Sequence, residues 1–155
     1  AAVARRASGE GAAGGATPLM LAAHTGEDAK LKELVGAGAD VNAQDTYGWT
    51  ALRFAVRAGH EEATKTLIEA GADLDLASSS GRTPLMSAAG NRLAHMVRIL
   101  IKGGADLKAR NSEGQTAYDL AKRGGSTGCT ACREMLYFEG AESEHKVPTI
   151  TMTDE

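Results

Sequence analysis

The sequence has few aromatic residues and few cysteines, and it carries no excess of charge of either sign. Of 155 residues, 4% are aromatic and two are cysteine, and the formal net charge is −3. Proteins that bind nucleic acid usually carry a concentrated excess of Lys and Arg, so we expect no nucleic-acid partner. The two cysteines, Cys129 and Cys132, are too few for the disulfide framework of a small secreted protein and fit a reducing compartment.

Long apolar runs are also absent from the chain. A membrane-spanning helix needs about 18 consecutive apolar residues, so we expect no membrane insertion. Because the chain begins with Ala1 rather than Met, we interpret it as a processed or excised segment from which any targeting peptide has been removed. These observations favour a cytoplasmic location and leave the nucleus or an organelle open.

Two sets of markers recur along the chain with a period of 33 residues. The first is a Thr that follows a Gly by two positions, and its members are Thr17, Thr50, Thr83 and Thr116. The second is a Gly-Ala-Asp triplet that begins at Gly38, Gly71 and Gly104. Two independent sets in the same register indicate tandem structural repeats.

Each repeat carries the signals of two short helices. Thr is a preferred N-cap, and the Pro after Thr17 and Thr83 suits the first turn of a helix. Apolar residues then recur on one helical face, and the second helix ends at a Gly that accepts a left-handed conformation. The 29 alanines and 19 glycines allow close packing. The pattern predicts inner helices near 18–24, 51–57, 84–90 and 117–122, and outer helices near 28–36, 61–69, 94–101 and 130–138.

These motifs resemble the ankyrin repeat. The resemblance rests on Thr17-Pro18-Leu19, Thr83-Pro84-Leu85, Ala22-Ala23, Ala88-Ala89, Gly59-His60 and the run from Gly38 to Asn42. It implies an all-α fold, an ankyrin-repeat solenoid of helix-turn-helix units with β-hairpin loops. The His that the family usually has after Thr-Pro-Leu is replaced by Met20, Arg53, Met86 and Asp119.

The repeat register divides the chain into six segments. We expect an N-terminal lead at 1–11, a capping first repeat at 12–44, two central repeats at 45–77 and 78–110, a capping fourth repeat at 111–138, and a C-terminal tail at 139–155.

Catalytic and metal-binding patterns are scarce, so we expect no enzyme, no cofactor and no metal. Cys129 and Cys132 have the spacing of zinc ligands and redox pairs, but no second pair follows them. The alternative is that Cys132 fills a small apolar position of the outer helix. By the resemblance, Asn42 matches a position that is hydroxylated in some ankyrin proteins, and the alternative is a structural turn asparagine.

In such a stack, the hairpin tips and the exposed side of the inner helices line a concave groove. Tyr47 and Trp49 lie at one tip, and Trp, Tyr and Arg are enriched in binding hot spots. The predicted partner-binding residues are Tyr47, Trp49, Arg53, Arg57, Arg82, Asn91, Glu113, Gln115 and Arg123, and the same mapping places Met20 and Met86 on this surface. The alternatives are that Trp49 folds back over the next hairpin as a packing contact and that the arginines form a solvated charged face.

The leading hypothesis is a non-catalytic protein-protein interaction module, an adaptor or scaffold for a protein partner whose identity the sequence does not give. One alternative is a structural subunit of a larger multiprotein complex, held through its termini. The other is a thiol- or zinc-dependent regulator that uses Cys129 and Cys132.

Overall fold

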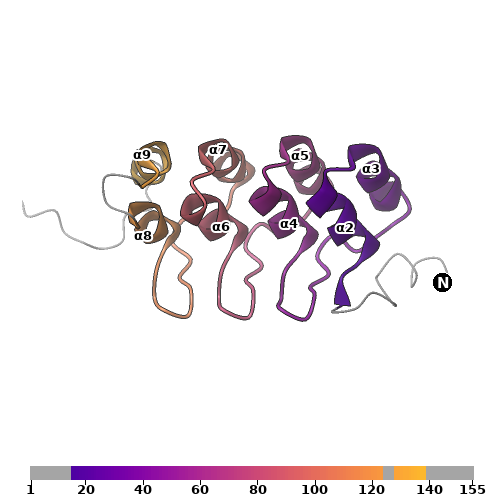
Figure 1. Cartoon of the computed structure of the whole chain (residues 1–155), viewed down its shortest axis with the longest axis horizontal. Coiled ribbons are helices and arrows are strands. Elements are labelled where there is room, and N and C mark those ends of the chain that lie inside the picture. Colours follow the sequence, from indigo (N-terminus) through magenta and orange to yellow (C-terminus); the bar gives the residue numbers. More distant parts are fainter. Residues whose placement is uncertain (1–14, 124–127, 139–155) are drawn as a thin grey trace, which may run out of the picture.

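The computed structural model is a row of helix pairs, and it describes residues 15–123 and 128–138. The inner layer contains α2 (Pro18–Thr25), α4 (Ala51–Ala58), α6 (Pro84–Gly90) and α8 (Ala117–Lys122). The outer layer contains α3 (Asp28–Gly36), α5 (Glu61–Glu69), α7 (Ala94–Gly103) and α9 (Thr130–Phe138). Figure 1 shows the two layers side by side along the row. The predicted helices are confirmed to within two residues at each end.

The described residues contain no assigned strand, which confirms the all-α class. The predicted lead at 1–11 and tail at 139–155 lie outside the described residues, and so do residues 124–127.

Each inner helix begins after a buried threonine that caps it. The hydroxyl oxygens of Thr17, Thr50, Thr83 and Thr116 accept a hydrogen bond from the backbone N–H of the third helical residue. Each of these acceptors satisfies one of the free N–H groups at the helix start. The third helical residues are Met20, Arg53, Met86 and Asp119, which are also the residues at the position of the family's usual His.

The expectation that Met20 and Met86 line the exposed surface is wrong. Each is only 1% exposed. Both side chains belong to the buried core, and the sulfur of Met20 accepts the N–H of its capping residue Thr17 at 3.4 Å. Methionine suits such an irregular apolar space because its unbranched side chain is flexible.

The loops that lead into the inner helices are hairpin turns. In the second repeat, the Asp45 N–H donates to the Trp49 oxygen at 3.0 Å, and the Gly48 N–H donates to the Asp45 oxygen at 2.9 Å. Gly48 has a φ of 75°, and a Cβ atom there would lie 3.0 Å from the Cα of Ser78. Glycine is therefore required both by the turn and by the approach of the next hairpin.

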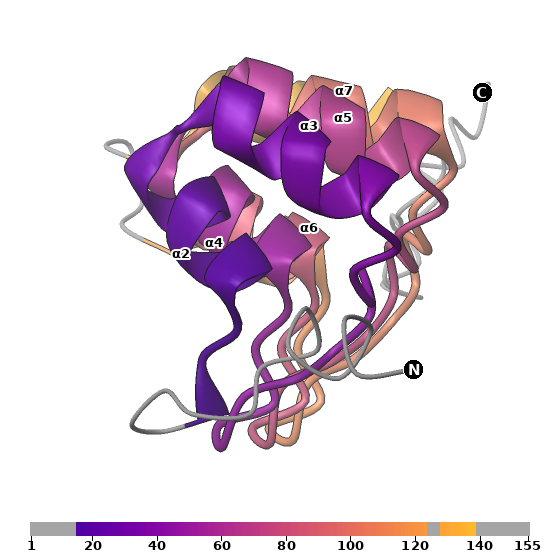
Figure 2. The ribbon, with the colours of Figure 1, turned by 90° about the vertical axis from the view of Figure 1, so that its right-hand side faces the viewer.

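Hydrogen bonds join each hairpin to the next one. The Ser79 N–H donates to the Tyr47 oxygen at 2.9 Å, and the Ser112 N–H donates to the Ser80 oxygen at 3.1 Å. In Figure 2, which looks along the row, the loops of successive repeats overlie one another and project away from the two helix layers. The tips therefore form a connected edge and not a set of independent loops.

A second set of contacts joins the repeats through side-chain oxygens. Asn42 Oδ1 accepts the Asp73 N–H at 2.7 Å, and Asp75 Oδ1 accepts the Asp106 N–H at 2.7 Å. The side chain of Asn42 thus makes the same bridge to the next repeat that a carboxylate makes one repeat later. This contact supports the structural interpretation of Asn42.

The core lies between the inner and outer layers and runs along the whole row. All eight described helices contribute a leucine that is at most 2% exposed: Leu19, Leu31, Leu52, Leu67, Leu85, Leu100, Leu120 and Leu136. Alanines pack between them, for example Ala55 and Ala88, both fully buried. Burial of these side chains is the main stabilising term of the fold.

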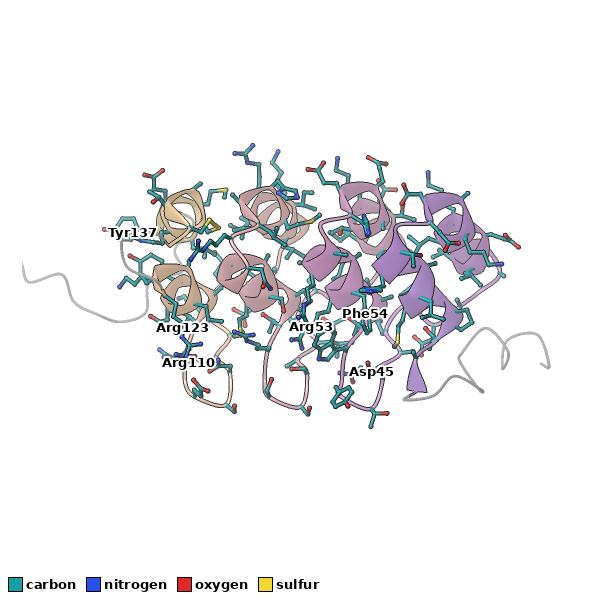
Figure 3. All side chains as sticks on the ribbon, in the orientation of Figure 1. Asp45, Arg53, Phe54, Arg110, Arg123 and Tyr137 are labelled. Atoms are coloured by element: carbon teal, nitrogen blue, oxygen red, sulfur yellow. A yellow bond between two sulfur atoms is a disulfide. The ribbon has the colours of Figure 1, made fainter. Side chains whose placement is uncertain are left out.

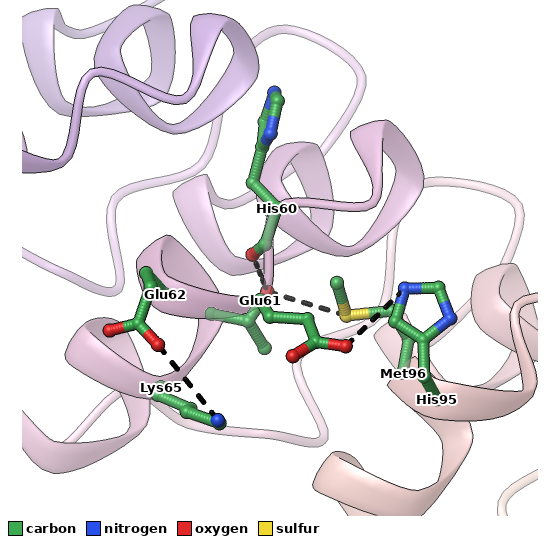
Figure 4. Close-up of polar contacts among 7 residues, drawn as sticks. His60, Glu61, Glu62, Lys65, His95 and Met96 are labelled. Carbon is green, nitrogen blue, oxygen red and sulfur yellow. Dashed lines mark hydrogen bonds and ion pairs between the residues drawn. The ribbon is translucent and has the colours of Figure 1, made fainter.

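Neighbouring outer helices also touch through polar groups. The buried hydroxyl of Thr64 on α5 donates to the His60 oxygen at 2.8 Å and lies 3.7 Å from the sulfur of Met96 on α7. Nearer the surface, His95 Nε2 lies 4.0 Å from Glu61 Oε1 (Figure 4). Because both members of this pair are about half exposed, the pair contributes little to stability.

Cys129 and Cys132 form a disulfide bond at the start of α9, which corrects the expectation of unpaired cysteines in a reducing compartment. Their Cα atoms lie 5.2 Å apart, a usual separation for a disulfide, because the first helical turn brings residues three apart together. Cys132 is fully buried, which confirms that it fills a small apolar position. The disulfide removes the cysteine argument for a cytoplasmic location.

Candidate functional site

Aromatic and cationic side chains meet where the second hairpin joins α4. The Cζ atoms of Arg53 and Arg57 lie 4.0 and 5.0 Å from the centroid of the Trp49 ring. The Phe54 ring lies 5.1 Å away, between centroids. Both guanidinium distances are within the range of a cation–π contact. We call Trp49, Arg53, Phe54 and Arg57 the Trp49 cluster.

The sequence produces this cluster through the start of α4. Trp49 immediately precedes the capping residue Thr50, so its ring lies beside the first turn of the helix. Arg53 and Arg57 are four residues apart and share one helical face. All the ring contacts of Trp49 within the described part of the chain are made with α4. These aromatic and cation–π contacts of the indole thus lie within its own repeat.

A hollow of about 370 Å³ opens beside the cluster and is lined by Asp45, Tyr47, Trp49 and Phe54. Tyr47 is 66% exposed at the hairpin tip. Asp45 Oδ1 accepts the N–H groups of Tyr47 and Trp49 at 2.9 and 2.8 Å, which fixes the tip. Figure 3 shows Arg53 and Phe54 on α4 above the loop that carries Asp45. We call this space the Trp49 hollow.

Arg53 is buried, although its place on the inner helix predicted that it would line the open surface with Met20 and Met86. Its side chain is only 5% exposed, and its Nε and Nη1 atoms are buried without a hydrogen-bond partner. Burial and, to a smaller extent, the nearby charges of Arg82 and Arg57 together lower the pKa of Arg53 to about 10, against the opposing effect of Asp45. The guanidinium therefore stays charged at neutral pH with donors that have no acceptor.

The other predicted site residues are spread over the third and fourth repeats. Arg82 is half-buried and carries a charge that acts on Arg53. The other four form hydrogen bonds within their own turns. Asn91 Nδ2 donates to the Ser87 oxygen, and the Arg123 N–H donates to the Leu120 oxygen. The N–H groups of Glu113 and Gln115 both donate to Asn111 Oδ1. Figure 3 places Arg123 at the α8 end, away from Arg53. The structure thus brings Trp49, Arg53 and Arg57 into contact, with Tyr47 and Arg82 beside them, and places Asn91, Glu113, Gln115 and Arg123 in the third and fourth repeats.

Two residues of the site were missed by the sequence analysis. Phe54 packs on Trp49 and lies 5.8 Å from the His24 ring of the first repeat, between centroids. Asp45 fixes the hairpin tip and borders the hollow. The role of Asp45 could have been predicted from the sequence. Asp45, Ser78 and Asn111 occupy the first position of equivalent turns, and Asp, Ser and Asn side chains commonly accept hydrogen bonds from the backbone of such turns.

A larger hollow of about 460 Å³ lies between the outer helices α5 and α7. Its charged residues carry both signs and are all exposed: Glu61, Lys65, Glu69, Arg98 and Lys102. Solvent already satisfies exposed charges, so none of them needs a partner as Arg53 does. The Trp49 cluster is therefore the stronger candidate despite its smaller hollow.

The described residues show neither a metal site nor a membrane span. They contain no group of three or more His, Cys, Asp or Glu side chains that could hold a metal ion. None of their helices has the length and apolar character required to cross a membrane.

Arg53→Met should stabilise the chain. Removing a buried cation with unpaired donors releases a penalty of about 1 to 3 kcal/mol, and losing the cation–π contact with Trp49 offsets part of it. We expect a net gain in the free energy of unfolding of roughly 1 kcal/mol, measured by urea denaturation. Arg98→Met, which removes an exposed charge from α7, should change stability by less than about 0.5 kcal/mol. A marked loss of stability in Arg53→Met would show that Arg53 is satisfied internally.

Helix pairs stacked in a row and joined edge to edge by their loops define a helical repeat solenoid. Two family models match the chain, one described as ankyrin repeats in three copies at residues 4–78 and one described as ankyrin repeats in many copies at residues 67–121. The chain belongs to the ankyrin repeat family. Comparison with curated proteins gives no match. Ankyrin repeats are generally protein-protein interaction modules and are typically non-catalytic.

Proposed function

We propose that this chain is a non-catalytic adaptor that binds one protein partner through the Trp49 cluster and the hairpin tip of Tyr47. The observation that carries the proposal is the Trp49 ring, which lies against two guanidinium groups beside an open hollow. Trp, Tyr and Arg are the residue types that most often dominate binding energy. Arg82 borders this surface, and Asn91, Glu113, Gln115 and Arg123 are its proposed extension over the third and fourth repeats.

The rigidity of the surface supports the same function. Asp45 fixes the hairpin tip through two backbone N–H groups, and Ser79 ties it to the next hairpin. A surface that is already ordered loses little conformational entropy when a partner binds. This order makes the Trp49 hollow a preformed docking place.

Affinity capture tests the proposal with two matched double variants. Tyr47→Ala with Trp49→Ala removes the proposed anchor. Tyr118→Ala with Tyr137→Ala removes another aromatic pair, whose ring centroids lie 6.4 Å apart at the far end of the row. We expect a protein captured by the native chain and by the Tyr118 and Tyr137 variant to be lost with the Tyr47 and Trp49 variant. If all three chains capture the same proteins equally, the proposal is wrong. Circular dichroism confirms that each variant is folded.

A further inference from the structure

We propose that the Trp49 cluster receives a carboxylate from an acidic segment of the partner, with Arg53 as the cation that pairs with it. This inference rests on the proposed function, because it names the chemistry of the partner for the same surface. A neighbouring apolar side chain of that segment would fill the Trp49 hollow.

The first support is the position that Arg53 occupies. It is the third residue of its inner helix, and the equivalent residues of the first and third repeats are Met20 and Met86, each 1% exposed. The same place in the fold is therefore filled by an apolar side chain on both sides of the second repeat. A cation at a position that favours methionine lowers stability, and such exceptions are expected at functional sites.

The second support is that Arg53 has no acceptor within the described chain. Its Nε and Nη1 atoms are buried and unpaired, and none of Arg53, Arg57 and Arg82 forms an ion pair with a described residue. An unpaired buried donor costs free energy until it finds an acceptor. A carboxylate that approaches where Arg53 keeps its remaining 5% exposure supplies an acceptor for the guanidinium, and it bonds to that group more strongly than a neutral acceptor does.

The third support is the sign of the local charge. Arg57 and Arg82 both act on Arg53 as positive charges, and Asp45 is the carboxylate that opposes them. Asp45 already accepts the two N–H groups of the hairpin tip. Three arginines against one carboxylate leave a positive balance, which an acidic side chain of the partner complements.

Peptide selection on the full chain tests the inference. Random peptides without tryptophan are displayed on phage, and those that bind the native chain but not Trp49→Ala are synthesised. Because the chain has one tryptophan, the fluorescence of Trp49 measures their affinity directly. We expect the selected peptides to contain Asp or Glu. Changing that residue to Asn or Gln should weaken binding to the native chain about tenfold, as expected for a lost charge-assisted hydrogen bond.

Two arginine variants show which cation receives the carboxylate. In Arg53→Met, the acidic peptide and its amide form should bind with affinities that differ by less than about twofold, because the pairing is gone. In Arg98→Met, which loses the same charge from an outer helix, the tenfold difference should remain. The native chain gives an independent readout, since the NMR signal of the Arg53 Nε–H group should shift with the acidic peptide and not with its amide form.

The outcomes separate this inference from the proposed function. Peptides that need Trp49 but bind equally well as acid and amide overturn the inference and leave the proposed function standing. If every phage peptide that binds the native chain binds Trp49→Ala equally well, both are overturned. Tighter binding when phosphoserine replaces the acidic residue also overturns the carboxylate assignment. A tenfold acid preference that survives in Arg53→Met overturns the role of Arg53.

Discussion

Leu100→Ala should lower the free energy of unfolding by about 2 to 5 kcal/mol. Leu100 is fully buried on α7, in the layer of leucines between the inner and outer helices. Truncation removes three carbon atoms and leaves a cavity that the neighbouring helices fill only in part, since each is also held by the adjacent repeat. Urea denaturation followed by circular dichroism measures the loss.

The chain contains a matched control for this change. Leu21 on α2 is 53% exposed, so Leu21→Ala deletes the same atoms without making a cavity and should change stability by no more than about 0.5 kcal/mol. Leu67→Ala on α5, at another fully buried position, should behave like Leu100→Ala. Equal effects at Leu21 and Leu100 would contradict a continuous core between the two helix layers.

The helices could be predicted from the sequence because their ends depend on local chemistry. The capping threonine fixes the start of each inner helix, and this signal needs no knowledge of the tertiary structure. The outer helix α7 runs two residues past its predicted end, to Gly103, because Gly104 takes the left-handed cap with a φ of 94°. A glycine pair offers two places for such a cap, and the sequence pattern does not choose between them.

The site could be predicted only in part. The spacing of Arg53 and Arg57 and their closeness to Trp49 follow from helical geometry. The burial of Arg53 does not, because a charged residue is normally exposed and the covering groups come from distant parts of the chain. The equivalent residues Met20 and Met86 indicated this burial, since a position that is filled by methionine in two repeats is an apolar one. Phe54 was missed because its partner, the Trp49 ring, lies outside the helix.

The disulfide shows a different limit. Two cysteines are too few for the set of disulfides that holds a small secreted protein together. That argument concerns such proteins as a class. It does not apply to a single bond between Cys129 and Cys132, whose spacing in the first turn of α9 alone brings them together. The pairing of the two cysteines therefore follows from local geometry, which the number of cysteines in the chain does not describe.

Trp49→Ala should weaken binding of the partner by about 2 to 4 kcal/mol, or roughly 30- to 1,000-fold in Kd. The change deletes the ring that contacts Arg53, Phe54 and Arg57 and that lines the hollow. Titration of the purified partner against native and variant chains measures the effect. Tyr137→Ala, which alters an aromatic residue on α9, should leave the affinity within about twofold of the native value.

Stability measurements on the same Trp49→Ala variant separate binding from packing. Trp49 is half-buried, so its truncation should cost stability by roughly 1 kcal/mol, much less than that of a buried leucine, and the variant should remain folded. A variant that keeps its affinity while its Tm falls would show that the indole only supports the start of α4. A large loss of affinity with a small loss of stability would instead place the energy of recognition at this hairpin, because the fold that presents it would be unchanged.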